Sequence, residues 1–519
     1  MDIFTSLYKE LNTYYVDTLS PEKLMHAGIN TMLDGLDPYT DYIPEEDMDD
    51  YRTQTTGQYG GIGAVIGTRG DFVIVSEPYE GFPADKAGLR SGDQILSIDG
   101  KDAKNYKTDQ VSAMLKGKPG TQVVVKIRRE EKAGKQTDFT VTMLREEIKI
   151  KNVPWFGMLN NHIGYIRLGG FTDRAGAEVK SALESLETNH HIKGVVFDLR
   201  GNPGGLLNEA INVANVFVDK NIQIVSTKGK IDEWNKSFVT TNEPVDLKIP
   251  MVILADGGSA SAAEIVSGSM QDLDRAVIIG QRTFGKGLVQ STRSLPFNAK
   301  LKITTAKYYI PSGRCIQALN YAERNADGSP VRTPDSLKVA FKTKNGRKVM
   351  DGGGIEPDVV LEPEKYARIT ISLLTKNLIS DYASDYRINH DKISAPTTFV
   401  LSDAEYEDFV AWVSKKDYDY TTKSEKLLDE FKAATEKEKY YNDVKDDYDA
   451  MKKTMIHDKA NDLEKEKVQI KSILEEEIAA RYYLNAGRIQ ASFKNDNEVK
   501  KALEVLDDTA KMNTILAKK

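Results

Sequence analysis

The chain has 519 residues, of which 40% are hydrophobic and 29% charged, and its formal net charge is −7. This balance is ordinary for soluble proteins and excludes a disordered chain, a collagen-like chain and a disulfide-stapled miniprotein. The negative charge excludes the globally basic surface that nucleic acids attract, so we expect no nucleic-acid partner. At roughly 100–200 residues per domain, the length predicts about three or four domains.

Targeting and redox signals are sparse. Cys315 is the single cysteine, so the chain cannot form an internal disulfide or a zinc site of several cysteines. No apolar run approaches the roughly 20 residues that a membrane helix needs, so no membrane span is expected. Residues 1–4 begin an amphipathic pattern without the features of a signal peptide. The chain is therefore expected to be either cytoplasmic or supplied without its signal.

The predicted elements begin with two helices and continue into a β-rich module. Apolar residues recur at helical spacing from Phe4 to Tyr15 and again over 24–36, which makes 1–56 an N-terminal helical region. From Gly57 the pattern changes to glycine-rich turns and short alternating strands. We assign 57–146 to this module.

Residues 147–362 alternate strands and helices, which indicates an α/β core. Strands are expected at 163–168, 195–199, 252–255, 276–280 and 300–310, with helices at 175–186 and from about 206 and 261. The last region, 363–519, is predicted to be helical and highly charged, a solvated domain without chemistry of its own. The predicted fold class is multidomain α+β, with helical regions at both ends.

One segment imitates a nucleotide-binding loop. Gly280, Gly285 and Lys286 fit the first seven positions of the phosphate-loop pattern, and they follow a strand. The pattern then needs Ser or Thr, but Gly287 stands there, and 288–292 favours a strand where the pattern needs a helix. We therefore reject nucleotide binding.

A second segment can carry a nucleophile. Ser261 and Glu264 have the spacing of a capping box, which places Ser261 at a helix N-terminus after a buried strand. At that position the next backbone amide and the helix dipole can stabilise an oxyanion. A serine that only caps the helix would have the same spacing, so the function depends on whether a base is present.

Lys286 is the candidate base. None of the six histidines lies in a glycine-rich turn of the core, which disfavours a Ser–His–Asp triad. Lys286 has apolar residues nearby, and desolvation would lower its pKa towards neutrality. In a strand, positions 286, 288 and 290 share one face, so Gln290 would point the same way and orient the lysine. The glycine-rich turn at 198–205 can supply a second oxyanion amide.

Four segments together resemble the carboxyl-terminal processing, or tail-specific, serine proteases. They are 198–205, 258–264, 285–290 and 308–314, and the resemblance extends over about 1–362, including 36–42. It implies a core of the Clp peptidase and crotonase type at 147–362. It implies that Ser261 is the nucleophile, Lys286 the general base and Gln290 the residue that orients the lysine.

The same resemblance implies an oxyanion hole and a tail-binding domain. The amides would come from Ala262 and from either Gly204 or Gly205. The module at 57–146 resembles the family's PDZ domain, which would receive a chain-terminal carboxylate on the turn formed by Gly60, Gly61, Ile62 and Gly63. A free strand edge would then pair with the extended tail.

The resulting hypothesis is a serine endopeptidase that needs no metal and no other cofactor. Its expected partners are proteins or peptides with free C-terminal tails. The family is usually exported, so the resemblance implies a bacterial enzyme of the periplasm or envelope. The motifs leave 363–519 unexplained, and the helical regions could bind an adaptor or form a homo-oligomer. The alternatives are a non-catalytic PDZ scaffold and an acyl-CoA-handling enzyme of related fold. Cys315 has no nearby base and is expected to be structural.

Overall fold

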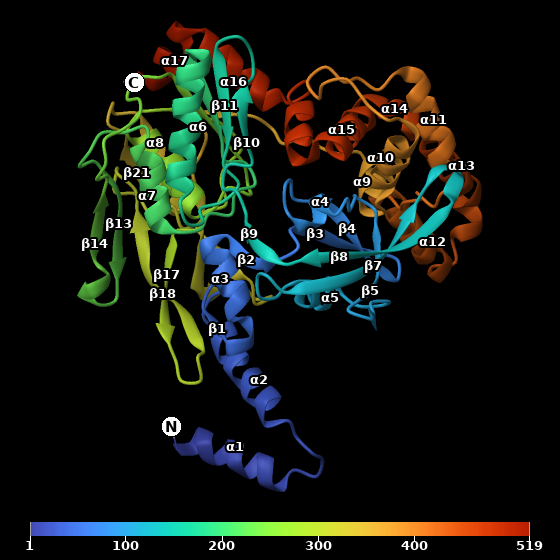
Figure 1. The fold of residues 1–519 in the computed structure, drawn as a ribbon, viewed down its shortest axis with the longest axis horizontal. Coiled ribbons are helices and arrows are strands. Elements are labelled where there is room, and N and C mark those ends of the chain that lie inside the picture. Colours follow the sequence, from blue (N-terminus) through green and yellow to red (C-terminus); the bar gives the residue numbers. More distant parts are fainter. Residues whose placement is uncertain (1, 518–519) are drawn as a thin grey trace. The chain divides into compact units, whose positions relative to one another are not determined.

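The computed structural model describes residues 2–517, and for residues 133 and 456–460 it describes the backbone alone. The chain forms two compact units, each assembled from separated stretches of sequence (Figure 1). Unit 1 contains Met1–Tyr59, Lys149–Glu362 and Glu498–Lys519, and unit 2 contains Gly60–Ile148 and Pro363–Asn497. Within residues 2–517, no helix combines the length and the apolar character needed to cross a membrane.

Unit 1 is built on a six-stranded sheet in which one edge strand is antiparallel and the other strands are parallel. In spatial order the strands are β10 (Trp155–Met158), β11 (Ile163–Arg167), β12 (Gly194–Asp198), β15 (Met251–Ala255), β16 (Val277–Gly280) and β23 (Val359–Val360). Strands β12, β15 and β16 are buried along their whole length, as parallel strands covered on both faces must be. Their carboxyl ends lie at one edge of the sheet, where α/β folds place their functional loops.

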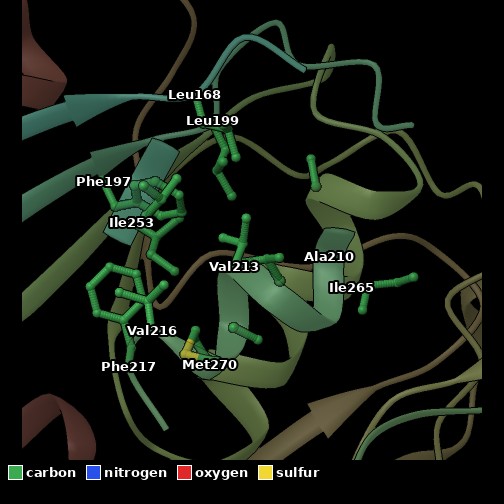
Figure 2. Packing of buried hydrophobic residues seen from close by; sticks show 14 of the residues in the cluster. Leu168, Phe197, Leu199, Ala210, Val213, Val216, Phe217, Ile253, Ile265 and Met270 are labelled. Carbon is green, nitrogen blue, oxygen red and sulfur yellow. The ribbon is translucent and has the colours of Figure 1, made fainter. Parts of the chain in front are cut away.

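Three helices and a second sheet complete the core of unit 1. The helices α6 (Ala175–His190), α7 (Leu207–Asn215) and α8 (Ala262–Asp272) follow β11, β12 and β15. Figure 2 shows Phe197 and Ile253 of the sheet beside Val216 and Phe217 at the end of α7. An antiparallel sheet packs on the same core and consists of β1 (Asp41–Ile43), β13 (Gln223–Gly229), β14 (Lys236–Val239), β17 (Leu288–Ser294) and β18 (Lys300–Tyr309).

The remaining elements of unit 1 come from both ends of the chain and from two small hairpins. They are α1 (Asp2–Tyr14), α2 (Pro21–Asp34), α3 (Met48–Thr56), β19 (Leu319–Arg324), β20 (Pro330–Arg332), β21 (Ala340–Lys342), β22 (Lys348–Met350), α16 (Asn497–Asp507) and α17 (Thr509–Leu516). The last two helices are tied to the core, because His162 Nε2 lies 2.7 Å from Asp507 Oδ1 and Asn345 Nδ2 donates to Leu516 O at 2.8 Å.

Unit 2 combines a β-rich module with a helical one. The β-rich module contains β3 (Ala64–Arg69), β4 (Phe72–Pro78), α4 (Pro83–Lys86), β5 (Gln94–Ile98), β6 (Lys101–Asp102), α5 (Thr108–Leu115), β7 (Gln122–Glu130) and β8 (Gln136–Leu144). The helical module contains α9 (Arg368–Thr375), α10 (Leu378–Asn389), α11 (Asp403–Val413), α12 (Lys423–Lys437), α13 (Tyr441–Ala460), α14 (Asp462–Lys465) and α15 (Lys467–Ser492). The two are joined by an Arg69–Asp381 ion pair of 2.5 Å and by Glu77, which accepts from Asn485 N and from Arg488. The short strands β2 (Gln58–Gly61) and β9 (Glu146–Lys149) pair with each other.

The expected elements of the α/β core are found. The helix predicted at 175–186 is α6, and the strands predicted at 195–199, 252–255 and 300–310 are β12, β15 and β18. One detail is wrong, because Lys286 does not lie in a strand. Strand β17 begins at Leu288, and its register with β18 shifts between Val289 and Gln290. The alternation of side chains predicted over 286–290 therefore does not hold.

Candidate active site

Ser261 lies between the end of β15 and the first residue of α8, as the sequence predicts. Its φ of 54° and ψ of −112° are rare for a residue with a side chain, and such strain is common at functional sites. The capping-box pair predicted from the spacing, Ser261 and Glu264, stands at the start of α8. The Ser261 N–H donates to Glu264 Oε2 at 2.8 Å, but the Ser261 hydroxyl does not cap the helix. The Ser261 hydroxyl is therefore not engaged by the helix N-terminus and can act as a nucleophile.

The glycine-rich turn after β12 lies directly against this serine. A Cβ atom on Gly204 would come within 2.8 Å of Ser261 Cβ and Ala262 N, so only glycine permits the approach. The Gly204 N–H already donates to Asn202 Oδ1 at 2.9 Å. Among the described residues, the N–H groups of Gly205 and Ala262 have no hydrogen-bond partner. These two amides are the ones that remain for an oxyanion.

Glu264 connects the serine to the lysine. Its buried carboxylate accepts from the Ser261 N–H at 2.8 Å, from the Gly285 N–H at 2.7 Å and from the Lys286 N–H at 2.9 Å. Thr283 Oγ1 adds a fourth donor at 2.5 Å. Burial raises the pKa of the Glu264 carboxyl, and the four donors oppose that rise. One carboxylate thus fixes the backbone of both candidate residues.

Lys286 occupies the loop between β16 and β17. Burial lowers the pKa of its ammonium to about 8, with a further lowering from Lys302, while Asp37 and Glu264 oppose the shift. Its Nζ atom lies 4.1 Å from the centroid of the Tyr39 ring. Among residues 2–517, no hydrogen bond is recorded between Lys286 Nζ and the Ser261 hydroxyl.

Gln290 lies near this loop but is engaged elsewhere. Its Nε2 donates to Thr304 Oγ1 at 3.0 Å, and Thr304 Oγ1 in turn donates to Asp37 Oδ1 at 3.2 Å. No described contact joins Gln290 to Lys286. The glutamine therefore belongs to a chain of hydrogen bonds that reaches the segment after α2.

Sequence reasoning missed an ionic cluster in the glycine-rich turn at 198–205. Burial opposes ionisation of Asp198, but the Arg200 and Arg167 guanidinium groups outweigh it and lower its pKa to about 2. Arg200 also pairs with Glu498 at 2.6 Å, and Glu498 accepts from Gln281 as well. Glu498 is about 300 residues from Arg200 in sequence, and no local pattern marks it.

Neither Cys315 nor the segment that imitates a phosphate loop, 280–286, has the features of a second site. Burial raises the pKa of the Cys315 thiol, which disfavours the reactive thiolate. A phosphate loop would be followed by a helix, but strand β17 follows Lys286. This agrees with the rejection of nucleotide binding.

The predicted tail-binding turn lies in unit 2, at the start of the β-rich module. The N–H groups of Ile62 and Gly63 have no partner among the described residues, and Gly63 has a left-handed φ of 71°. Strand β3 follows as an edge strand whose partner in the sheet is β4. Gly60 has a packing role, because a Cβ there would lie 2.1 Å from Gly117 O.

Three family models match the chain. Residues 162–322 match "Peptidase family S41", residues 74–129 match "PDZ domain", and residues 369–506 match "Probable PDZ-protease, C-terminal helical domain". The predicted fold class, with a PDZ domain before a protease core and a helical C-terminal region, is confirmed.

Curated relatives agree with these models. The chain is 34% identical over 376 residues to a carboxy-terminal-processing protease of Bartonella bacilliformis, covering 71% of this chain and 77% of the relative. It is 32% identical over 379 residues to a probable CtpA-like serine protease of Staphylococcus aureus, covering 72% and 66%. A solved photosystem II D1 C-terminal processing protease is 27% identical, with 70% of this chain and 93% of that chain covered and a TM-score of 0.38. The chain therefore belongs to the carboxy-terminal-processing proteases of peptidase family S41 and is a serine-type peptidase with a PDZ domain.

Proposed function

We propose that this peptidase cuts peptide bonds with a Ser261–Lys286 dyad after its PDZ domain has bound the substrate's carboxyl terminus. The observation that carries the dyad is the Glu264 carboxylate, which accepts from the backbone amides of both residues. The lowered pKa of Lys286, about 8, supports its role as the base. Because the chain is a serine-type peptidase, the scaffold and acyl-CoA alternatives are not favoured.

The chemistry follows from these positions. Neutral Lys286 takes the proton of the Ser261 hydroxyl while Oγ attacks the scissile carbonyl carbon. The tetrahedral oxyanion accepts hydrogen bonds from the Ala262 and Gly205 amides; we choose Gly205 because the Gly204 N–H is already bonded. The Lys286 ammonium then protonates the leaving amine. The same lysine then takes a proton from water, whose oxygen attacks the acyl carbon; the bond to Ser261 Oγ breaks, and the lysine returns the proton to Oγ.

Gln290 is proposed to act on the lysine indirectly. Gln290 donates to Thr304, and Thr304 donates to Asp37. These two hydrogen bonds support a role of Gln290 in positioning the residues around Lys286. The sequence pattern predicts instead that Lys286 and Gln290 lie side by side on one face of a strand, and the present proposal replaces that arrangement.

A fluorophosphonate probe tests the nucleophile. Ser261 Oγ should displace fluoride from phosphorus, and peptide mapping by mass spectrometry should find the adduct on the peptide that contains Ser261. The Ser261→Ala variant should remain unlabelled while melting like the wild type. A label on another residue, or equal labelling of Ser261→Ala, would contradict the proposed nucleophile.

The PDZ domain is proposed to read the terminal carboxylate of the substrate. The unbonded Ile62 and Gly63 amides and the edge position of β3 support this role, and Gly60 and Gly61 precede these amides at the end of β2. Hydrogen bonds to a charged group contribute about 1.5–3 kcal/mol, so amidating a tail peptide should weaken its binding by about tenfold to a hundredfold. Calorimetric titration with the free acid and the amide measures the difference. Equal affinities would contradict carboxylate recognition.

The surroundings of the enzyme are also proposed. The named relatives are bacterial, and we place this enzyme in the bacterial periplasm or envelope, which cell fractionation tests. Helix α1 exposes Ile3, Phe4 and Leu7, and this supports a contact to an adaptor or to a second copy through the helical regions. Light scattering decides between these two, since only the second copy makes the purified chain oligomeric. The boundaries 1–56, 57–146, 147–362 and 363–519 remain proposed domain limits.

A further inference from the structure

The ammonium of Lys286 rests on the face of an aromatic ring that comes from the N-terminal region. Tyr39 lies between α2 and β1, and its ring centroid is 4.1 Å from Lys286 Nζ. An ammonium within about 6 Å of a ring face is attracted by the quadrupole of the ring. Among residues 2–517, the structure records no hydrogen bond or ion pair of Lys286 Nζ that competes with this contact.

The ring is held in place from two sides. On one side, Asp37 Oδ1 accepts from the Tyr39 and Thr40 N–H groups, each at 2.9 Å, and Oδ2 accepts from the Thr40 hydroxyl at 3.0 Å. Thr304 of β18 donates both its N–H and its hydroxyl to this turn, at 3.2 Å each. On the other side, the Tyr321 hydroxyl donates to the Tyr39 hydroxyl at 3.3 Å, and the two rings meet edge to face at 88°. A ring fixed in this way can define where the lysine rests.

The attraction depends on the charge of the lysine. A ring face stabilises an ammonium but offers little to a neutral amine, so the contact weakens when Lys286 loses its proton. The neutral amine is then free to move towards the serine hydroxyl. The other charged groups around the lysine are Lys302 on β18, Asp37 in the turn and Glu264 on α8.

We propose that Tyr39 is a positioning residue of the active site, whose ring holds the protonated form of Lys286 at rest and sets the pH at which the lysine becomes available as a base. The inference rests on the proposed function, since it takes Lys286 as the base. It makes the turn at 37–40 a part of the catalytic apparatus, although this turn lies more than 200 residues before the dyad in sequence.

The test is the pH profile of Tyr39 variants. In Tyr39→Leu the lysine keeps an apolar neighbour but loses the ring, so its pKa should fall. The acidic limb of kcat/KM, and of the fluorophosphonate labelling rate, should then move to lower pH by about 0.5 to 1 unit. Tyr39→Phe keeps the ring face and should restore the wild-type limb. Tyr42→Leu makes the same change at a tyrosine of the neighbouring strand, whose recorded ring contact is with His26, and should leave the limb in place.

A second series guards against a variant that fails to fold. Phenylalanines of increasing fluorination at position 39 keep the shape of the ring and weaken its quadrupole. The acidic limb of kcat/KM should therefore move to lower pH with each added fluorine. If the acidic limb of kcat/KM stays at the wild-type pH in Tyr39→Leu, or does not move with fluorination, the role of Tyr39 is overturned. The Ser261–Lys286 dyad is not affected by that result. Activity that survives in Lys286→Arg would instead overturn the dyad, so the two failures are distinguishable.

Discussion

Lys286→Arg is expected to lower kcat/KM for peptide hydrolysis by about a thousandfold or more. A base must be neutral before it can take a proton. With a pKa of about 8, roughly a tenth of the lysine is neutral at pH 7, whereas an arginine is protonated throughout the accessible range. Wild-type kcat/KM should accordingly rise with pH and level off above about pH 8. Steady-state kinetics from pH 6 to 10 measure both effects.

Lys302→Arg is the matched control for this experiment. Lys302 faces Lys286 from β18 and keeps its charge in the variant, so most activity should remain. Thermal melting of both variants checks that the fold is intact. A Lys286→Arg enzyme that works within tenfold of the wild type would remove the lysine from the mechanism.

Glu264→Gln should impair both stability and catalysis. The amide keeps one acceptor oxygen but replaces the other with a donor, so two of the four groups that now point at the carboxylate lose their acceptor. Buried donors left unpaired cost about 1–3 kcal/mol each, so the free energy of unfolding should fall by about 2–6 kcal/mol. When the amide nitrogen replaces Oε2, the backbone N–H groups of Ser261 and Lys286 lose the acceptor that they share, and kcat should fall by about a hundredfold.

Glu209→Gln separates these two effects. Glu209 on α7 is also buried and accepts from the Gly176 N–H at 2.8 Å, but among the described residues it has no hydrogen bond to Ser261 or Lys286. Its loss should lower the melting temperature and leave kcat per folded enzyme close to the wild type. If Glu264→Gln likewise kept its kcat, Glu264 would be a stabilising residue without influence on the dyad.

The α/β core could be read from the sequence because its signals are local. Strands such as β12 and β15 are continuous apolar runs that end in glycine-rich turns, and these turns bear the site residues. The lysine was harder to place, since a run of strand-forming residues after Gly287 does not reveal that the strand begins only at Leu288. The spacing placed Ser261 at a helix N-terminus, but no local pattern announces the positive φ of its backbone.

Other parts of the site depend on contacts between distant segments. Tyr39 and Lys286 meet where β1 and the turn before it join β18, and neither residue carries a pattern that points to the other. Arg200 meets Glu498 for a similar reason, after about 300 intervening residues. Contacts between segments so far apart cannot be inferred from local patterns in a single sequence. The local patterns and the family resemblance supplied the proposed dyad but not the groups that surround it.

The return of the chain to unit 1 at Glu498 has a consequence for biosynthesis. Arg200 lies beside the glycines proposed for the oxyanion hole and pairs with the Glu498 carboxylate of α16, while α17 contacts the same core through Leu516. During translation, these segments leave the ribosome long after the serine and the lysine have done so. Unit 1 therefore completes its packing only when nearly all of the described chain has left the ribosome. A nascent or prematurely terminated chain lacks the contacts that α16 and α17 make with this unit.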